Sequence, residues 1–261
     1  NIGDKNLSDF LELPDRDILA KTRPFYEFTE TLFSQGFHHW HRILTSPSER
    51  RVKILDRYTN TEREMVMMAS NNYLGLTTHP RVKEAARRAL EKFGIGAGSV
   101  PLLGGTLDLH RELEQKLAEM KGCEDAIIFT SGYSSNVGCV SALVRKGDVA
   151  INDRLNHASL IDGCRLSGGT LRAFCHNDMA SLEKVLASCD REFQGKLIIV
   201  DGVFSMDGIV ADLKGVCDLA DKYEAMVMVD ECHAAGFIGK TGRGSVEHCG
   251  VTGRVDIITG T

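Results

Sequence analysis

Short apolar runs alternate with amphipathic segments through the second half of the chain, and this alternation constrains the fold more than any other feature. The runs expected to be strands are 126–129, 149–151, 170–174, 197–200, 226–229 and 257–258. The segments with helical spacing lie near 134–145, 158–167, 179–189 and 212–223. Strands that alternate with helices in this way predict an α/β fold with a mostly parallel sheet and helices on both faces.

The first part of the chain has a different pattern. Residues 1–70 are predicted to form an N-terminal arm and a small β-meander, and residues 71–261 to form the large α/β domain. Pro80 starts a stretch with apolar residues at helical spacing. A glycine-rich loop at 94–105 follows, and Thr106 is the expected N-cap of a second helix.

Composition and charge argue against several classes of protein. The net charge of −5 and the pI near 6.0 disfavour a nucleic-acid surface, which is usually basic. No apolar run is long enough to span a membrane, and no basic start followed by an apolar segment marks a secretory signal. The eight cysteines form no C-x-x-C pair, which fits free thiols in a reducing cytoplasm. The first residue is Asn1, so we expect the chain to be a piece of a longer protein.

Three histidines cluster in the N-terminal arm, at His38, His39 and His41. Histidine ligands to a metal are usually joined by Cys, Asp or Glu, and none of these supports the cluster. We therefore interpret the three histidines as surface or packing residues and expect no metal site.

Polar residues follow the ends of the predicted strands. These clusters are 130–136, 156–159, 201–208, 230–233 and 259–261. The carboxyl ends of parallel strands meet at one edge of the sheet, so the clusters predict one binding crevice. Asp230 there could pair with a cationic ring nitrogen, and His233 could bond a second ring substituent. The glycine turn at Gly132 opens a helix whose N-terminus suits a phosphate.

Other readings of the acidic stretch 230–233 compete with this one. Asp230 could be an ordinary turn or cap residue, or the stretch could be the metal-binding box of an ATP-driven helicase. A helicase needs a phosphate loop upstream, and the glycines at 94–98 lack the lysine, while Gly239-Lys240-Thr241 lies downstream. The G-x-G-x-x-G signature of a dinucleotide fold between a strand and a helix and the G-x-S-x-G of a serine hydrolase are also absent.

As a set, the motifs resemble the α-oxoamine synthase family of pyridoxal-phosphate enzymes, over about residues 68–261. The segments that carry the resemblance are Ser70–Leu76, Gly104–Thr106 with His110 and Glu112–Glu114, Thr130–Asn136, Asn156–Ser159, Asp201–Gly208, Asp230–His233 and Asp256–Thr261. The resemblance implies the fold-type I aminotransferase architecture, a homodimer and pyridoxal 5′-phosphate (PLP) as cofactor.

The resemblance also implies roles for residues around the phosphate. Gly132 and Tyr133 would donate backbone N–H groups to it, with Ser131 beside them. Thr261 would reach the same phosphate from the end of the last strand.

Around the pyridine ring, the resemblance implies catalytic roles for His157, Asp230 and His233. His157 would stack on the ring, Asp230 would hold the ring nitrogen, and His233 would bond the ring oxygen with Ser205 nearby. Asn72 would face the amino-acid substrate.

The resemblance implies an acyltransferase that condenses an amino acid (Ser, Gly or Ala) with an acyl thioester and releases carbon dioxide. The acyl donor would be a coenzyme A ester or an acyl-carrier protein. Rivals are a glycine C-acetyltransferase or an aminotransferase of the same fold, and a non-catalytic partner subunit that lacks the lysine.

Two departures from the family pattern stand out. The Schiff-base lysine would lie three residues beyond Thr261, and the C-terminal domain would follow it, so both are expected outside this sequence. Where many members carry an arginine, this chain has Pro101.

Overall fold

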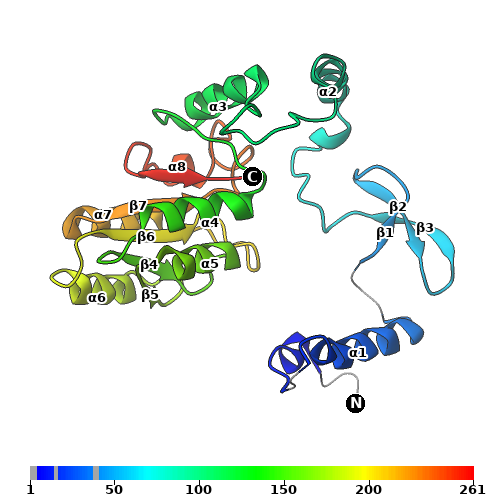
Figure 1. Cartoon of the computed structure of the whole chain (residues 1–261), viewed down its shortest axis with the longest axis horizontal. Coiled ribbons are helices and arrows are strands. Elements are labelled where there is room, and N and C mark those ends of the chain that lie inside the picture. Colours follow the sequence, from blue (N-terminus) through cyan, green and yellow to red (C-terminus); the bar gives the residue numbers. More distant parts are fainter. Residues whose placement is uncertain (1–4, 15–16, 38–40) are drawn as a thin grey trace. The chain divides into compact units, whose positions relative to one another are not determined.

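The computed structural model describes residues 5–14, 17–37 and 41–261, which leaves His38 and His39 outside the described residues. The chain divides into two compact units, Asn1–Lys92 and Phe93–Thr261 (Figure 1). This division falls later than the expected boundary at residue 70, because the segment that follows the small sheet and nearly all of the next helix (residues 80–93) lie in the N-terminal unit.

The first unit contains two long helices and a small sheet. Its elements are η2 (Leu7–Phe10), η3 (Ala20–Thr22), α1 (Arg23–Ser34), β1 (Ile43–Leu44), β2 (Arg51–Asp56), β3 (Thr61–Val66), η4 (Leu76–Thr78) and α2 (Pro80–Phe93), whose last residue crosses into the second unit. Strands β1, β2 and β3 form an antiparallel sheet in that order, which confirms the predicted meander and adds the short β1. Asp56 Oδ1 accepts the backbone N–H groups of Tyr58 and Thr59 and so shapes the β2–β3 turn.

The second unit has the predicted α/β architecture. Its elements are α3 (Asp108–Lys121), α4 (Gly132–Leu143), β4 (Val149–Asp153), α5 (Ala158–Ser167), β5 (Thr170–Phe174), α6 (Met179–Cys189), β6 (Lys196–Asp201), α7 (Leu213–Tyr223), β7 (Met226–Asp230), α8 (Ser245–His248) and β8 (Ile257–Thr259). The five strands form one parallel sheet in the order β5-β4-β6-β7-β8.

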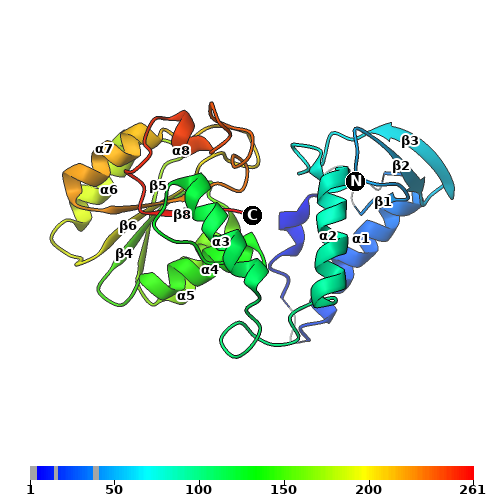
Figure 2. The same cartoon turned by 90° about the horizontal axis from the view of Figure 1, so that it is seen from above.

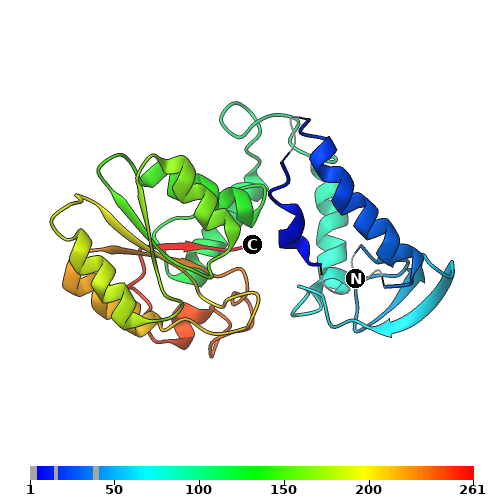
Figure 3. The ribbon, with the colours of Figure 1, turned by 90° about the horizontal axis from the view of Figure 1, so that it is seen from below.

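Helices cover both faces of this sheet (Figure 2). Strand β6 shows the reason, because its side chains alternate between two cores. Leu197 and Ile199 pack with residues of α4 and α5, whereas Ile198 and Val200 pack with residues of α6 and α7. The same two layers are visible from the opposite side (Figure 3).

Two local predictions are wrong. Residues 126–129 form no strand, because no strand of the described chain pairs with them. The backbone N–H of Ile128 instead donates to the Glu114 carboxylate at 3.1 Å. Thr106 is not the N-cap of α3, since that helix begins at Asp108 after Leu107, and the Thr106 hydroxyl donates to the carbonyl of Pro101.

No helix in the described part of the chain is long and apolar enough to cross a bilayer.

Candidate active site

The carboxyl ends of three neighbouring strands place polar residues side by side in the second unit. Asp201 at the end of β6 is in register with Asp230 at the end of β7, and Asp230 is in register with Thr259 of β8. Both carboxylates are almost fully buried. Burying two acids beside each other is unfavourable unless each is hydrogen-bonded or neutral, which makes this edge a candidate site.

Asp230 is held by donors on both carboxylate oxygens. Its Oδ2 accepts from the Asn136 amide of α4 at 2.6 Å, and its Oδ1 accepts from the backbone N–H of Cys232 at 2.9 Å. The same Asn136 amide donates to Ser159 Oγ at 2.9 Å, and this hydroxyl lies 2.7 Å from His157 Nδ1. A hydrogen-bonded chain therefore connects Asp230 with His157.

Asp201 lies on the other side of the same network. Its carboxylate accepts from the backbone N–H of His157 at 3.1 Å, and its own N–H donates to Asn156 Oδ1 at 2.9 Å. Burial, with a smaller contribution from the charge of Asp230, raises the pKa of Asp201 to about 8. Asp201 therefore keeps its proton at neutral pH in the cofactor-free protein.

The N-terminus of α4 meets the end of the chain at this edge. A Cβ atom added to Gly132 would lie only 2.9 Å from Thr261 Cβ and 3.2 Å from Cys232 Sγ, so a larger residue would collide there. Ser131 caps the helix, because its Oγ accepts the backbone N–H of Ser134 at 3.1 Å.

Tyr133 follows with its ring edge-on to the ring of His157, at a centroid distance of 6.5 Å. Its hydroxyl donates to Asp162 at 2.5 Å, and this bond raises the pKa of Tyr133.

The remaining predicted residues are His233, Ser205 and Asn72. His233 is half-buried just after β7, and Ser205 is exposed on the loop between β6 and α7. Asn72 lies in the first unit, where its side-chain amide donates to the Ser48 carbonyl at 3.0 Å and to Thr77 Oγ1 at 2.7 Å.

Two residues that organise this site, Asn136 and Ser159, had no predicted role. Both are fully buried and both bond to predicted site residues. The sequence does contain a signal for Asn136. This residue lies one helical turn before the buried Val140, and a polar residue on the apolar face of a helix is expected to be buried with a hydrogen-bond partner.

Glu231 has a different task from its neighbour Asp230. It is fully buried and accepts from the Ser245 hydroxyl at 2.7 Å and from the backbone N–H of Val246 at 2.9 Å. Lys121 Nζ, at the end of α3, lies 3.5 Å from the same carboxylate. Glu231 therefore connects the end of β7 with α3 and with the start of α8. In a metal-binding acidic box, the corresponding carboxylate would have to be exposed to bind the metal.

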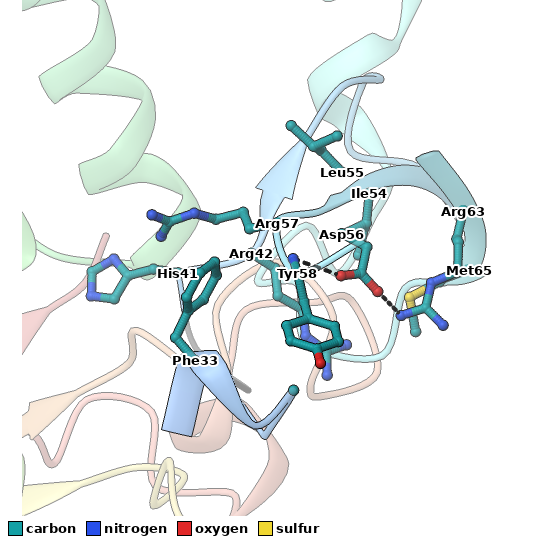
Figure 4. Close-up of a pocket in the computed structure, with 11 residues that line it drawn as sticks. Phe33, His41, Arg42, Ile54, Leu55, Asp56, Arg57, Tyr58, Arg63 and Met65 are labelled. Carbon is teal, nitrogen blue, oxygen red and sulfur yellow. Dashed lines mark hydrogen bonds and ion pairs between the residues drawn. The ribbon is translucent and has the colours of Figure 1, made fainter. Parts of the chain in front are cut away.

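A cavity of about 190 Å³ lies in the first unit (Figure 4). Its lining residues include Phe33, His41, Asp56, Tyr58 and Arg63, and none of the predicted site residues. The Asp56 carboxylate is bonded to Arg63 and to the Tyr58 backbone. Within the described residues, no group of three or more His, Cys, Asp or Glu side chains could hold a metal ion.

Comparison with known proteins relates the chain to a family of known fold. The model of the family described as aminotransferase class I and II matches residues 63–261. An 8-amino-7-oxononanoate synthase of Thermoanaerobacter pseudethanolicus is 47% identical over 235 residues, covering 90% of this chain and 58% of that protein. A 2-amino-3-ketobutyrate coenzyme A ligase of Salmonella typhimurium is also 47% identical, covering 89% of this chain and 57% of that protein.

A solved structure of a serine palmitoyltransferase from S. paucimobilis, with bound PLP and myriocin, matches with a TM-score of 0.87 and 35% identity. The match covers 94% of this chain and 61% of that chain. This chain thus spans somewhat more than half the length of the relatives that it matches.

Proposed function

Because this chain belongs to the aminotransferase class I and II family, we propose that it holds PLP at the carboxyl edge of its parallel sheet. The observation that carries the proposal is the buried Asp230 carboxylate, bonded by Asn136 and facing the edge where Gly132, Thr261 and His157 gather. The solved serine palmitoyltransferases with PLP, at 35% identity, support the same cofactor.

The residues present fit the phosphate of this cofactor. Gly132 and Tyr133 occupy the first two positions of α4, where backbone N–H groups have no acceptor within the helix. The helix dipole adds a partial positive charge there, which favours a phosphate. Ser131 and Thr261 would add hydroxyl donors, and the missing side chain at Gly132 allows Thr261 to approach this helix end closely.

The residues also fit the ring. Asp230 would keep a proton on the ring nitrogen, because an ionised carboxylate stabilises the adjacent positive charge. His157 would lie on the ring face, held by Ser159, while His233 and Ser205 would bond the ring oxygen. Two buried polar atoms near this edge, Asn136 Oδ1 and Thr259 Oγ1, have no hydrogen-bond partner in the described residues.

PLP supplies an electron sink that stabilises negative charge on the α-carbon of a bound amino acid. We propose that the whole protein uses this chemistry to condense an amino acid, Ser, Gly or Ala, with an acyl thioester and to release carbon dioxide. The names of the relatives, an 8-amino-7-oxononanoate synthase and a 2-amino-3-ketobutyrate coenzyme A ligase, support condensation of an amino acid with an acyl thioester. The first name supports release of carbon dioxide, whereas 2-amino-3-ketobutyrate keeps the carboxylate and fits the glycine acetyltransferase alternative. Asn72 is proposed to contact the amino acid.

The alternatives differ in their products. An aminotransferase or a glycine acetyltransferase of the same fold would retain the carboxylate, and a non-catalytic subunit would make no product.

We further propose a homodimer in a reducing cytoplasm. All eight cysteines are unpaired, which supports that compartment.

The test is the near-visible absorption spectrum of the protein with PLP, followed during separate additions of Ser, Gly and Ala. A bound-cofactor band that shifts with one amino acid, followed by carbon dioxide release when acyl-coenzyme A or acyl-carrier protein is added, is the expected result. Asp230→Asn should slow product formation on the order of 100-fold or more. Glu192→Gln makes the same carboxyl-to-amide change on an exposed side chain and should have no effect.

A protein that binds no PLP would refute the cofactor assignment. Product that retains the carboxylate would identify the rival transferases, and bound PLP without turnover would identify the non-catalytic subunit.

A further inference from the structure

A second buried cluster lies beside the candidate site and takes no part in the chemistry proposed above. Asp153 ends β4 and is only 1% exposed. Its Oδ1 lies 3.1 Å from His176 Nδ1, and its Oδ2 accepts the backbone N–H of Asn177 at 2.8 Å. One buried carboxylate therefore fixes the two residues His176 and Asn177, shortly after β5 ends.

These two residues contact the loop between β6 and α7, residues 202–212, which we call the β6–α7 loop. The His176 ring packs edge-on against the buried Phe204 ring at a centroid distance of 4.4 Å and 90°. His176 Nε2 lies 3.6 Å from Asp207 Oδ2, which is beyond hydrogen-bond length, so the Phe204 contact is the main link to the loop.

Asn177 holds the far end of the same loop. Its side-chain oxygen accepts the backbone N–H of Asp212 at 2.8 Å, at the N-cap of α7. Asn177 adopts the left-handed conformation, with φ of 50°, which asparagine tolerates better than most residues. The β6–α7 loop is therefore held near its middle and at its end by one anchored segment.

Between these holding points the loop makes a tight turn that presents Ser205. The backbone N–H of Phe204 donates to Ile209 O at 3.0 Å, and the N–H of Gly208 donates to Phe204 O at 2.9 Å. Gly208 has φ of +73°, which glycine adopts without strain. Phe204 points into the core while Ser205 and Met206 are exposed at the tip, so the position of Ser205 depends on how Phe204 is seated.

We propose that His176 and Asn177, anchored by Asp153, are positioning residues that set where Ser205 lies at the cofactor site. The proposal rests on the proposed function, because it takes Ser205 as a partner of the PLP ring oxygen. The mechanism has a direct physical basis: a side chain on a loop is placed accurately only if the loop itself is packed and hydrogen-bonded in one arrangement.

The first test needs no cofactor. Hydrogen–deuterium exchange of peptides covering 202–212 is compared in wild type, His176→Ala and His176→Asn. His176→Ala removes the contacts to Asp153, Phe204 and Asp207, so exchange in the loop should speed up roughly tenfold while peptides of β6 and β7 stay protected. His176→Asn keeps a donor near the position of Nδ1 and should give an intermediate rate.

The control is His248→Ala, which changes an exposed histidine on α8 and should leave the loop unchanged. Unchanged exchange in His176→Ala would overturn the proposal. General loss of protection would also count against it, because the effect would then be global destabilisation rather than loss of loop position.

The second test uses PLP and separates positioning from stability. Ser205→Ala and His176→Ala should each weaken PLP binding several-fold and change the absorption band of the bound cofactor in the same direction. The double variant should be no worse than the more affected single variant, because both remove the same contact. If the losses of PLP affinity in the two single variants add up in the double variant, the proposal is overturned. If wild type binds no PLP, the proposed function is refuted, and the hydrogen–deuterium exchange test alone decides whether His176 positions the loop.

Discussion

Replacing Asp201 by Asn should stabilise the cofactor-free protein at alkaline pH. In the folded state the pKa of Asp201 is raised to about 8, mainly by burial, whereas in the unfolded chain it is about 3.9. Between these two values the folded state holds a proton that the unfolded state has released. Stability therefore falls as pH rises from about 4 to about 8, and levels off once both states are ionised.

The size of the effect follows from the two pKa values. One pKa unit corresponds to about 1.4 kcal/mol, so four units give an upper limit of about 5.5 kcal/mol. Asn is neutral at every pH and can still accept the backbone N–H of His157 that Asp201 accepts at 3.1 Å. We expect Asp201→Asn to match wild type near pH 4 and to exceed its stability by a few kcal/mol at pH 8 to 9.

The assay is urea unfolding followed by circular dichroism at each pH unit from 5 to 9. The difference in unfolding free energy between Asp201→Asn and wild type should grow with pH by about 1 kcal/mol per unit. The exposed Glu192→Gln should show a small difference that does not change over this range. Parallel profiles for Asp201→Asn and wild type, or a variant that is less stable at pH 8, would refute the reasoning.

Substitutions at two further positions, Glu231 and Gly132, test other parts of the second unit. Glu231→Ala leaves Lys121 Nζ and the N–H groups of Ser245 and Val246 without their buried acceptor, so it should cost about 3–5 kcal/mol in urea unfolding, and Glu231→Gln should cost less. A cost below about 1 kcal/mol for Glu231→Ala would show that the ion pair is not a stabilising link. Gly132→Ala should lower the urea midpoint only modestly but weaken PLP binding at least about tenfold, measured by equilibrium dialysis, because the added methyl group displaces Thr261 from this helix end. Unchanged PLP affinity in Gly132→Ala would argue against a phosphate at this helix end.

Periodicity in the sequence predicted most of the second unit, since the burial of alternate strand residues and one helix face leaves a clear pattern. The segment 179–189 was predicted as a helix and is α6. The run 126–129 was misjudged because a strand needs a neighbouring strand, and an apolar stretch does not reveal whether one is present.

The site was predictable only in part. Polar residues after strands indicated one edge of the sheet, and the register of Asp201, Asp230 and Thr259 places these residues together. The bond between Asn136 and Asp230 could not be predicted, because it joins residues 94 positions apart and depends on how α4 docks on the sheet. The proton on Asp201 likewise depends on burial, which no local pattern specifies.

The long separation between bonded residues at this edge has a consequence for how the protein folds. Asn136 meets its carboxylate partner only after 94 further residues, and Lys121 donates to the carbonyl of Arg243 across 122. Contacts this distant in sequence close large loops and form late in folding. As the chain leaves the ribosome, Asn136 and Lys121 therefore lack these partners until residues 230–243 have emerged, and binding competence is among the last properties that the unit acquires.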